Sequence, residues 1–242
     1  MIIHSKIDKG IIRHSNQDAF IAGQLSPDVT FGIVCDGMGG ANAGNIASEI
    51  AVKTVSEYLY NSYRNNMTID DFDRVVKSAV SSANLQIFDR ASKNENLSGM
   101  GTTIVIAVVK GNDVIIAHVG DSRIYLVNDN LLQLTKDHSI VQSLVELGKI
   151  SPEDAKIHPR KNVITRALGV ESDVIIDIDF LTINDGETLM LCTDGLTNFV
   201  GEDIILKTFK ENEISTVCEK LVDLANVGGG GDNITVVTLT AQ

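Results

Sequence analysis

The chain has 242 residues, 43% of them hydrophobic, with a formal net charge of -12 and a pI of about 4.7. The length fits one large domain or two small ones with a sizeable core. A chain this acidic is repelled by phosphate polyanions, which argues against nucleic acid as a partner. No apolar run approaches the ~18 residues of a membrane span, and the N-terminus has no signal-peptide pattern, so we expect no membrane insertion.

The three cysteines, Cys35, Cys192 and Cys218, show no C-x-x-C spacing. Cys35 and Cys192 lie in strand-like runs, and Cys218 lies on a helical face. We interpret all three as buried thiols, which suits a reducing compartment. The expected location is the cytoplasm.

The N-terminal part of the chain alternates between two periodicities. Apolar runs predict strands at residues 2–7, 19–22 and 31–35, with a polar loop at 13–18 between the first two. Helical spacing then predicts helices over residues 45–63 and 69–91. Asp70 and Asp71 at the start of the second helix suit a cap and the helix dipole.

The middle of the chain reads as successive strands. A glycine-rich turn at 98–103 leads into predicted strands at 103–109, 114–119, 123–127 and 131–134. Because the turns between them are short, we predict an antiparallel meander and not a βαβ arrangement.

Residues 137–162 change to a helical pattern. One short helix ends at Gly148, and a second begins with Ser151 as N-cap and Pro152 in its first turn. The basic patch at 158–161 suits either contact with an acidic phosphopeptide or an ordinary solvated surface. Strands at 175–180, 188–192 and 234–240 and helices at 204–209 and 215–226 follow. We expect a single domain over 1–242, with a small helical insert at about 137–162.

Four aspartates stand beside glycine at the ends of predicted strands: Asp36, Asp121, Asp194 and Asp232. One Asp-Gly pair alone is typical of a turn, but four at strand ends indicate a shared site. Carboxylates without His or Cys at metal-ligand spacing favour Mg²⁺ or Mn²⁺, and Ca²⁺ less because no loop resembles an EF-hand. Two such ions ~3.5–4 Å apart can activate a bridging water for phosphate-ester hydrolysis.

Two further residues complete this candidate site. The carbonyl of Gly37 is a candidate ligand, because a residue without Cβ lets an ion approach. Asp36 is the candidate for a carboxylate shared by both ions. Arg13 in the polar loop offers two parallel donors to a phosphate group.

Eight short motifs follow one another along nearly the whole chain: Arg13-x-x-Asn16-Gln17-Asp18, Asp36-Gly37-Met38-Gly39-Gly40, Ser98-Gly99-Met100-Gly101-Thr102-Thr103, His118-Val119-Gly120-Asp121-Ser122-Arg123, Asp137-His138-Ser139, Thr165-Arg166-Ala167-Leu168-Gly169, Thr193-Asp194-Gly195-Leu196 and Asp232-Asn233-Ile234-Thr235. The ordered set resembles the metal-dependent protein phosphatase (PPM) family, the type 2C Ser/Thr phosphatases, in its compact bacterial form. The resemblance implies an α+β fold, a four-layer α-β-β-α sandwich of two antiparallel sheets flanked by helices. It also implies that the insert at about 137–162 is a flap beside the active site.

The resemblance assigns a metal-ligand set of two core ions and a third. Asp36 would bridge two Mg²⁺ or Mn²⁺ ions, the Gly37 carbonyl would bind one, and Asp194 and Asp232 would complete the pair. Asp121, together with Asp194, would hold the third ion that bacterial members often carry.

The resemblance also implies three supporting roles. Asp18 would orient metal-bound water, Asn233 would support the site, and Arg13 would hold the phosphate.

Three positions depart from the family pattern. Met38 stands where many eukaryotic members carry a histidine that is a candidate general acid, and methionine cannot donate a proton. Asn198 stands near the third ion where many members have Asp, and Gln17 stands where many have Glu. Each of the last two removes a formal charge without removing a core ligand, so we keep Asn198 as a supporting residue and assign no general acid.

Other polar residues in the motifs have simpler interpretations. We read His118 and His138 as structural, held by packing and hydrogen bonds. Thr102 and Thr103 are expected to start a strand, and Met100 to fill a gap in the core.

The resemblance implies a Mg²⁺/Mn²⁺-dependent serine/threonine phosphoprotein phosphatase acting by direct attack of a metal-activated water. No Cys or Ser is set beside a base as a nucleophile. The implied partners are phosphoproteins, including a eukaryotic-type Ser/Thr kinase that the enzyme opposes, and the chain is expected to be a monomer. Two alternatives stay open: a phosphatase for one dedicated regulator, such as an anti-anti-sigma factor, and a catalytically silent module that binds phosphoproteins. Retention of Asp36, Asp194 and Asp232 argues against the silent module.

Overall fold

A computed structural model describes residues 1–40 and 43–242. Its elements in chain order are β1 (Ile2–Asp8), β2 (Asp18–Ser26), β3 (Val29–Met38), α1 (Ala43–Ser62), α2 (Ile69–Ser92), the 3-10 helix η1 (Glu95–Leu97), β4 (Gly101–Thr102), β5 (Ile104–Lys110), β6 (Asp113–Val119), β7 (Arg123–Val127), β8 (Leu131–Gln133), α3 (Ile140–Glu146), α4 (Pro152–Ile157), β9 (Asp177–Thr182), β10 (Thr188–Cys192), α5 (Asp194–Thr197), α6 (Glu202–Glu211), α7 (Ile214–Val227) and β11 (Ile234–Thr240).

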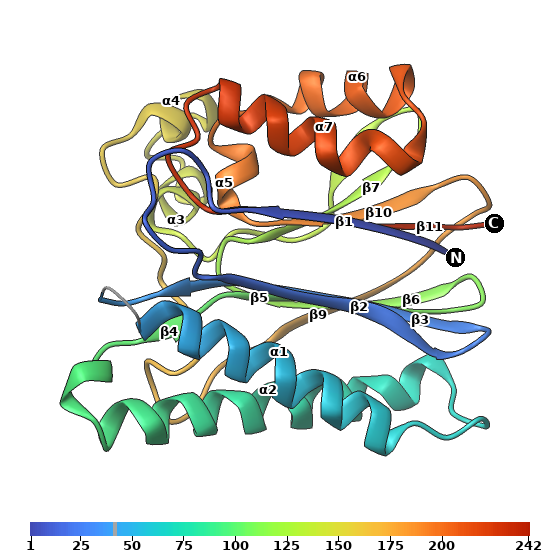
Figure 1. The fold of residues 1–242 in the computed structure, drawn as a ribbon, viewed down its shortest axis with the longest axis horizontal. Helices are drawn as coiled ribbons and strands as arrows, with labels where there is room; N and C mark the ends of the chain where they lie inside the picture. Colours follow the sequence, from blue (N-terminus) through green and yellow to red (C-terminus); the bar gives the residue numbers. More distant parts are fainter. Residues whose placement is uncertain (41–42) are drawn as a thin grey trace.

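Two antiparallel sheets lie face to face with helices on both outer sides (Figure 1). One sheet has the strand order β1-β11-β10-β7-β8, and the other has the order β2-β3-β5-β6-β9, with β4 paired to β3. Helices α1 and α2 cover the second sheet, and α6 and α7 cover the first. This arrangement confirms the predicted four-layer α-β-β-α sandwich, and α3 and α4 lie within the predicted flap.

The central strands are buried on both faces, which explains their continuous apolar sequences. In β3, Phe31, Ile33 and Cys35 pack with the core under α1 and α2, whereas Val34 joins the core between the two sheets. Successive side chains of a strand point to opposite faces, so one strand contributes to two cores. A third core lies between the first sheet and helices α5, α6 and α7.

The predicted meander is wrong at its centre. Strands β5 and β6 pair as a hairpin in the second sheet, but β7 and β8 belong to the first sheet. The chain therefore crosses between sheets at Gly120-Asp121-Ser122, where Gly120 has a φ of 108°. Both sheets need the same apolar periodicity, so the sequence pattern gives no indication of which sheet a strand joins.

Two element boundaries near the predicted site also differ from expectation. Strand β3 continues to Met38, so Asp36 and Gly37 lie within a strand and not in a turn after it. Asp18, expected in the polar loop, is the first residue of β2 and pairs with Asp36 in the strand register.

The helix starts follow their predicted capping chemistry. Asp71 accepts a hydrogen bond from the backbone N–H of Thr68 at 2.9 Å, so it closes the first turn of α2. Ser151 accepts from the backbone N–H of Asp154 at 3.1 Å and caps α4, with Pro152 as the first helical residue.

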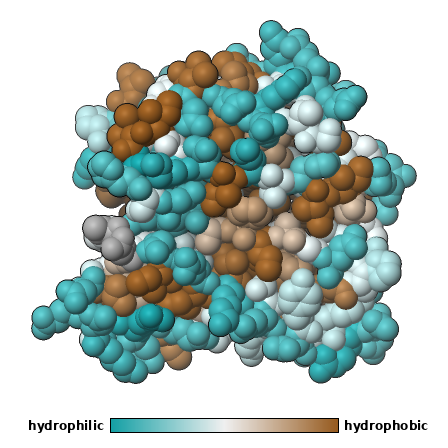
Figure 2. All heavy atoms as spheres, viewed as in Figure 1, coloured by the Kyte–Doolittle hydropathy of each residue, from teal (hydrophilic) through white to brown (hydrophobic). Residues whose placement is uncertain are grey.

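The surface seen in Figure 2 is hydrophilic over most of its area, with apolar side chains in several separate patches, one of them near the level between the two sheets. Within residues 1–40 and 43–242, the helices are all too short or too polar to cross a membrane.

Candidate metal centre

The four strand-end aspartates meet in one pocket at one end of the two sheets. The pocket has a volume of about 250 Å³ and is lined by Arg13, Gln17, residues 36–39, Thr103, Asp121, Asn162, Ile164, Asp194, Asp232 and Asn233. Asp36 comes from the second sheet, Asp194 and Asp232 flank strands of the first, and Asp121 lies on the crossing between them. The fold thus brings together four acids that are far apart in the sequence.

Asp18 does not line this pocket, but it pairs with Asp36 in the strand register and is held by two threonines. Its Oδ2 accepts hydrogen bonds from Thr235 Oγ1 at 2.6 Å and from Thr193 Oγ1 at 2.9 Å. Its other oxygen, Oδ1, is buried without a hydrogen-bond partner among the described residues, and so is Oδ1 of Asp194. Buried carboxylate oxygens without a donor are costly, so each is suited to a cation.

Burial and mutual repulsion raise the pKa values of these acids. Burial is the largest cause for Asp18, whose pKa rises to about 7, and for Asp121, whose pKa rises to about 8. Burial also raises the pKa of Asp36 well above its usual value, with further increases from Asp18 and Asp194. The pKa of Asp194 is raised by burial and then by Asp232. The site is therefore a concentration of negative charge that a bound cation would offset.

These donors fit Mg²⁺ or Mn²⁺. All are oxygens, they converge from both sheets, and the buried Oδ1 of Asp194 lacks a hydrogen-bond donor among the described residues, as does Oδ1 of Asp18, which pairs with Asp36 in the strand register. The Arg13 guanidinium, 2.8 Å from Asp232 Oδ2, contacts one edge of the cluster only. Hard divalent cations prefer such carboxylate sites.

The raised pKa values predict how the metal-free protein responds to pH. A carboxyl whose pKa rises on folding contributes stability below its usual value of 3.8, and this contribution is lost as pH rises through about 7 for Asp18 and about 8 for Asp121. We expect the Tm of chelator-treated protein to fall by about 5 °C or more between pH 5.5 and 8.5. Thermal unfolding across this range measures the effect, and Asp18→Asn should flatten the slope. A Tm that rises with pH in the metal-free protein would contradict the prediction.

Three predicted residues hold the site in place through hydrogen bonds. Arg13 donates from Nη2 to Asp232 Oδ2 at 2.8 Å and lies at the pocket rim. Asn233 accepts from the Gln17 backbone N–H at 2.7 Å and donates to two carbonyls of the loop before it, so it fixes the loop that carries Arg13. Asn198 donates to Asp194 Oδ2 at 2.8 Å.

The structure gives a different reason for the glycine at position 37. A Cβ there would lie 2.1 Å from the Gly44 carbonyl oxygen and 2.6 Å from the Gln17 carbonyl oxygen. Both are backbone atoms, so neither can turn aside as a flexible side chain would. Glycine is required where the start of α1, the loop before β2 and strand β3 approach one another.

A second polar cluster, formed by His118, His138 and Asp177, has ligand atoms within 4.8 Å of one another. It is poorly suited to a cation because Arg166 already donates to Asp177 and lies 3.0 Å from His138 Nε2. His138 Nδ1 instead accepts the backbone N–H of Gly120 at 3.0 Å. These contacts agree with the structural reading of both histidines, because His138 clamps the crossing that carries Asp121.

Sequence reasoning missed the threonines that hold the acids. Thr103 Oγ1 accepts the Asp36 N–H at 2.9 Å, and Thr102 Oγ1 donates to the Asp36 carbonyl at 2.9 Å. Thr193 and Thr235 play the same part for Asp18. Thr193 stands beside Asp194 and Thr235 stands three residues after Asp232, which is the signal that could have identified these two; Thr102 and Thr103 follow a glycine-rich turn without an acid beside them. Helix α5, which starts at Asp194, was also not predicted.

Comparison with known proteins gives one consistent result. A family model described as protein phosphatase 2C matches residues 5–222. A serine/threonine phosphatase stp of Listeria welshimeri is 42% identical over 236 residues, covering 96% of this chain and 92% of that protein. The structure of the S. agalactiae serine/threonine phosphatase has a TM-score of 0.93 at 33% identity, covering 100% of this chain and 99% of that one.

A further solved structure contains metal ions. The catalytic domain of serine threonine protein phosphatase PstP in complex with two manganese ions has a TM-score of 0.86 at 32% identity, covering 100% of this chain and 98% of that one. The family model spans most of the chain, and the relatives agree with it over nearly the full length. The chain belongs to the protein phosphatase 2C family.

Proposed function

We propose that the chain, a serine/threonine phosphatase of the protein phosphatase 2C type, hydrolyses phosphoserine and phosphothreonine in proteins by direct attack of water activated by Mg²⁺ or Mn²⁺. The observation that supports this proposal is the convergence of Asp36, Asp121, Asp194 and Asp232 on one pocket, where the buried Oδ1 of Asp194 has no hydrogen-bond donor among the described residues. Such ions, when bound, supply a nucleophilic water at neutral pH and positive charge beside the phosphate.

Neither a cysteine nor a serine is among the described residues that line the pocket, which supports direct attack. Burial raises the pKa of all three thiols, to about 12 for Cys192 and about 11 for Cys218, and well above the usual value for Cys35. Thiols held protonated are poor nucleophiles. The three cysteines are free and buried, which also supports the proposed reducing cytoplasmic location.

One group of residues would hold the metal ions or orient their ligands. Asp36, the Gly37 carbonyl, Asp194 and Asp232 would hold two core ions, and Asp121 with Asp194 would hold a third. Asn198 would keep Asp194 oriented through its 2.8 Å hydrogen bond.

The remaining residues would act on substrate and water. Arg13 would bind the phosphate from the pocket rim, where its side chain is 48% exposed. Asp18 would orient the attacking water, and Asn233 would fix the loop that carries Arg13.

The test is a metal titration. Chelator-treated protein should hydrolyse a small aryl phosphate only after Mn²⁺ or Mg²⁺ is added, and the Asp194→Asn variant should stay inactive at the same concentrations. Absence of activity at every metal concentration, in protein with native circular dichroism, would refute the proposal and favour the silent phosphoprotein-binding module.

Replacing Arg13 by alanine should weaken phosphate binding by about 1.5–3 kcal/mol, the range for a hydrogen bond to a charged group, or roughly 10- to 150-fold. The effect should appear in KM or kcat/KM of the Mn²⁺-loaded protein. Arg13→Lys should recover only part of the loss, because a lysine lacks the forked pair of donors. Arg90→Ala, at an exposed position on α2, is the matched control. Unchanged KM and kcat/KM in Arg13→Ala would exclude its assigned role.

We further propose that residues 1–242 form a single catalytic domain with a flap at about 137–162, that the protein is a monomer, and that its substrates are phosphoproteins, including a cognate Ser/Thr kinase. One dedicated regulator as the sole substrate is the alternative. Incubating the active enzyme with a phosphorylated kinase and with a phosphorylated regulator, and comparing kcat/KM, would separate the two.

A further inference from the structure

A second pocket borders the metal centre. It has a volume of about 370 Å³, and we call it the loop groove; its lining consists of Met38, residues 164–167, Val170, Glu171 and residues 173–175. Met38 and Ile164 line both this groove and the metal pocket, so the two spaces are neighbours. A substrate with its phosphate at the metal centre can therefore place residues next to the phosphorylated one in this groove.

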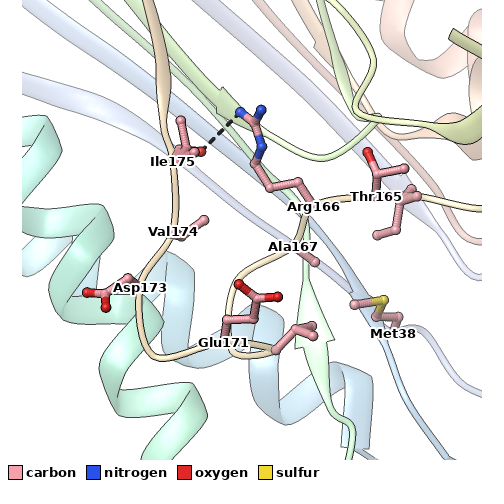
Figure 3. A pocket seen from close by; sticks show the side chains of 10 residues that line it. Met38, Thr165, Arg166, Ala167, Glu171, Asp173, Val174 and Ile175 are labelled. Atoms are coloured by element: carbon pink, nitrogen blue, oxygen red, sulfur yellow. Dashed lines mark hydrogen bonds between the residues drawn. The ribbon is translucent and has the colours of Figure 1, made fainter. Parts of the chain in front are cut away.

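The groove is built from a loop whose backbone is fixed. The buried Asn84 of α2 accepts the Gly169 N–H at 2.8 Å and donates to the carbonyls of Glu171 and Ser172, both at 3.0 Å. Arg166 donates to the Ile175 carbonyl at 3.1 Å and so ties one arm of the loop to the other (Figure 3). A preformed groove binds its occupant without the entropic cost of ordering the loop.

The groove presents apolar side chains to solvent. Val170 is 51% exposed and Ile175 is 72% exposed, and Ala167 and Val174 also line the space. Exposed apolar side chains gathered in a hollow are typical of binding sites, because an apolar occupant removes them from water. The volume is within the range of pockets that bind small ligands or side chains.

The charged side chains of the groove that have no ion-pair partner among the described residues are negative. Arg166 is neutralised by Asp177, which it contacts directly. Glu171 points between the two arms of the loop, whereas Asp173 points outward on the side of α2 (Figure 3). Neither acid forms an ion pair within the described residues, so a positively charged group is the complementary partner for Glu171.

We propose that the loop groove binds an aliphatic side chain of the phosphoprotein substrate close in sequence to the phosphorylated residue, and that Glu171 pairs with an adjacent Lys or Arg. This inference rests on the proposed phosphatase function. The proposal predicts a preference for basic residues beside the phosphorylated one. If the basic patch at 158–161 selected the substrate, acidic residues would be preferred instead. The substrate class is therefore a phosphoserine or phosphothreonine segment flanked by aliphatic and basic residues.

The first experiment measures sequence preference in the Mn²⁺-loaded enzyme. A set of phosphothreonine peptides carries leucine, glycine or aspartate at each flanking position in turn, with lysine or glutamate beside it. We expect at least one flanking position at which leucine gives about tenfold higher kcat/KM than glycine, the size of effect of a partly filled apolar pocket. At the neighbouring position, lysine should exceed glutamate about threefold. Equal kcat/KM across the set would overturn the proposal, as would a consistent preference for glutamate.

The second experiment tests whether the side chains of the loop groove cause the sequence preference. Ile175→Ala should reduce the leucine preference, and Glu171→Lys should invert the lysine preference. The readout is the ratio of peptide to aryl phosphate kcat/KM, so a general loss of activity does not enter. Ile204→Ala on α6 and Glu95→Lys on η1 change exposed residues of the same types away from the groove and should keep the wild-type ratios. Wild-type ratios in both groove variants would overturn the proposal.

The outcomes distinguish failure of the groove proposal from failure of the proposed phosphatase function. If Mn²⁺-loaded protein hydrolyses neither aryl phosphate nor any peptide, the proposed function fails. If it hydrolyses all peptides equally, only the groove proposal fails. A dimer in sedimentation that Ile175→Ala dissociates would mean that a second copy of the chain covers the groove, which also overturns the proposal.

Discussion

Replacing Asp36 by asparagine is expected to abolish metal-dependent activity while making the metal-free protein more stable. Removing one partner from a buried charged contact typically costs about 3–5 kcal/mol, so metal affinity and activity should fall roughly 150- to 5,000-fold. Without metal the same carboxylate is unfavourable, because burial and the neighbouring acids Asp18 and Asp194 raise its pKa. Neutral asparagine removes that repulsion, and the Tm of the metal-free variant at pH 8 should exceed that of the wild type.

Two measurements test this pair of opposite effects. Calorimetric titration with Mn²⁺ reports affinity, and thermal unfolding with and without chelator reports stability. Asp129→Asn changes an exposed aspartate in the turn before β8 and is the matched control. Full activity of Asp36→Asn without bound metal would contradict the bridging role, and a lower metal-free Tm would contradict the electrostatic argument.

Replacing Gly37 by alanine should destabilise the protein by about 3 kcal/mol or more, at the upper end for overpacked sites. The added Cβ would lie 2.1 Å from the Gly44 carbonyl oxygen, so β3 and the start of α1 would have to separate. That movement would displace Asp36, one residue away, and activity should fall with stability. Denaturant unfolding and aryl phosphate hydrolysis measure the two losses.

The same motif supplies a matched control for this prediction. Among residues 1–40 and 43–242, no atom lies within 4 Å of a Cβ built on Gly40, and Gly40 does not have a positive φ. Gly40→Ala should therefore change the free energy of unfolding by less than about 0.5 kcal/mol, as for an ordinary surface substitution. Equal effects of the two substitutions would mean that backbone freedom, and not the close approach to α1, explains the glycine at position 37.

Much of the fold follows from the sequence because the strands are buried on both faces. Strands β10 and β11 have the predicted bounds, since a continuous apolar run has sharp ends where polar residues begin. The assignment of β7 to the opposite sheet could not be predicted, because pairing between distant strands leaves no mark on the local period. The crossing at Gly120 is held by His138, which follows β8 in the chain and accepts the Gly120 N–H.

The acids of the candidate site could be predicted from the sequence, but the threonines that hold them were harder to predict. Asp-Gly pairs at strand ends are visible in the sequence, and the family resemblance gives each a role. Thr193 and Thr235 look like ordinary strand residues, and only the pairing of β10 with β11 brings both hydroxyls to Asp18. The steric reason for Gly37 could not be predicted from the sequence, because its close approach to Gly44 depends on how α1 packs on β3.

The convergence of acids at one end of both sheets makes that end mechanically different from the other. Without cations, the repulsion among Asp18, Asp36 and Asp194 is concentrated at this end of the sheets. Backbone amide exchange should therefore be graded along single strands: in β3, amides near Asp36 should exchange faster than those near Val29 once metal is removed. Bound ions would act as cross-links between chain segments distant in sequence, joining the two sheets as a disulfide does in a secreted protein.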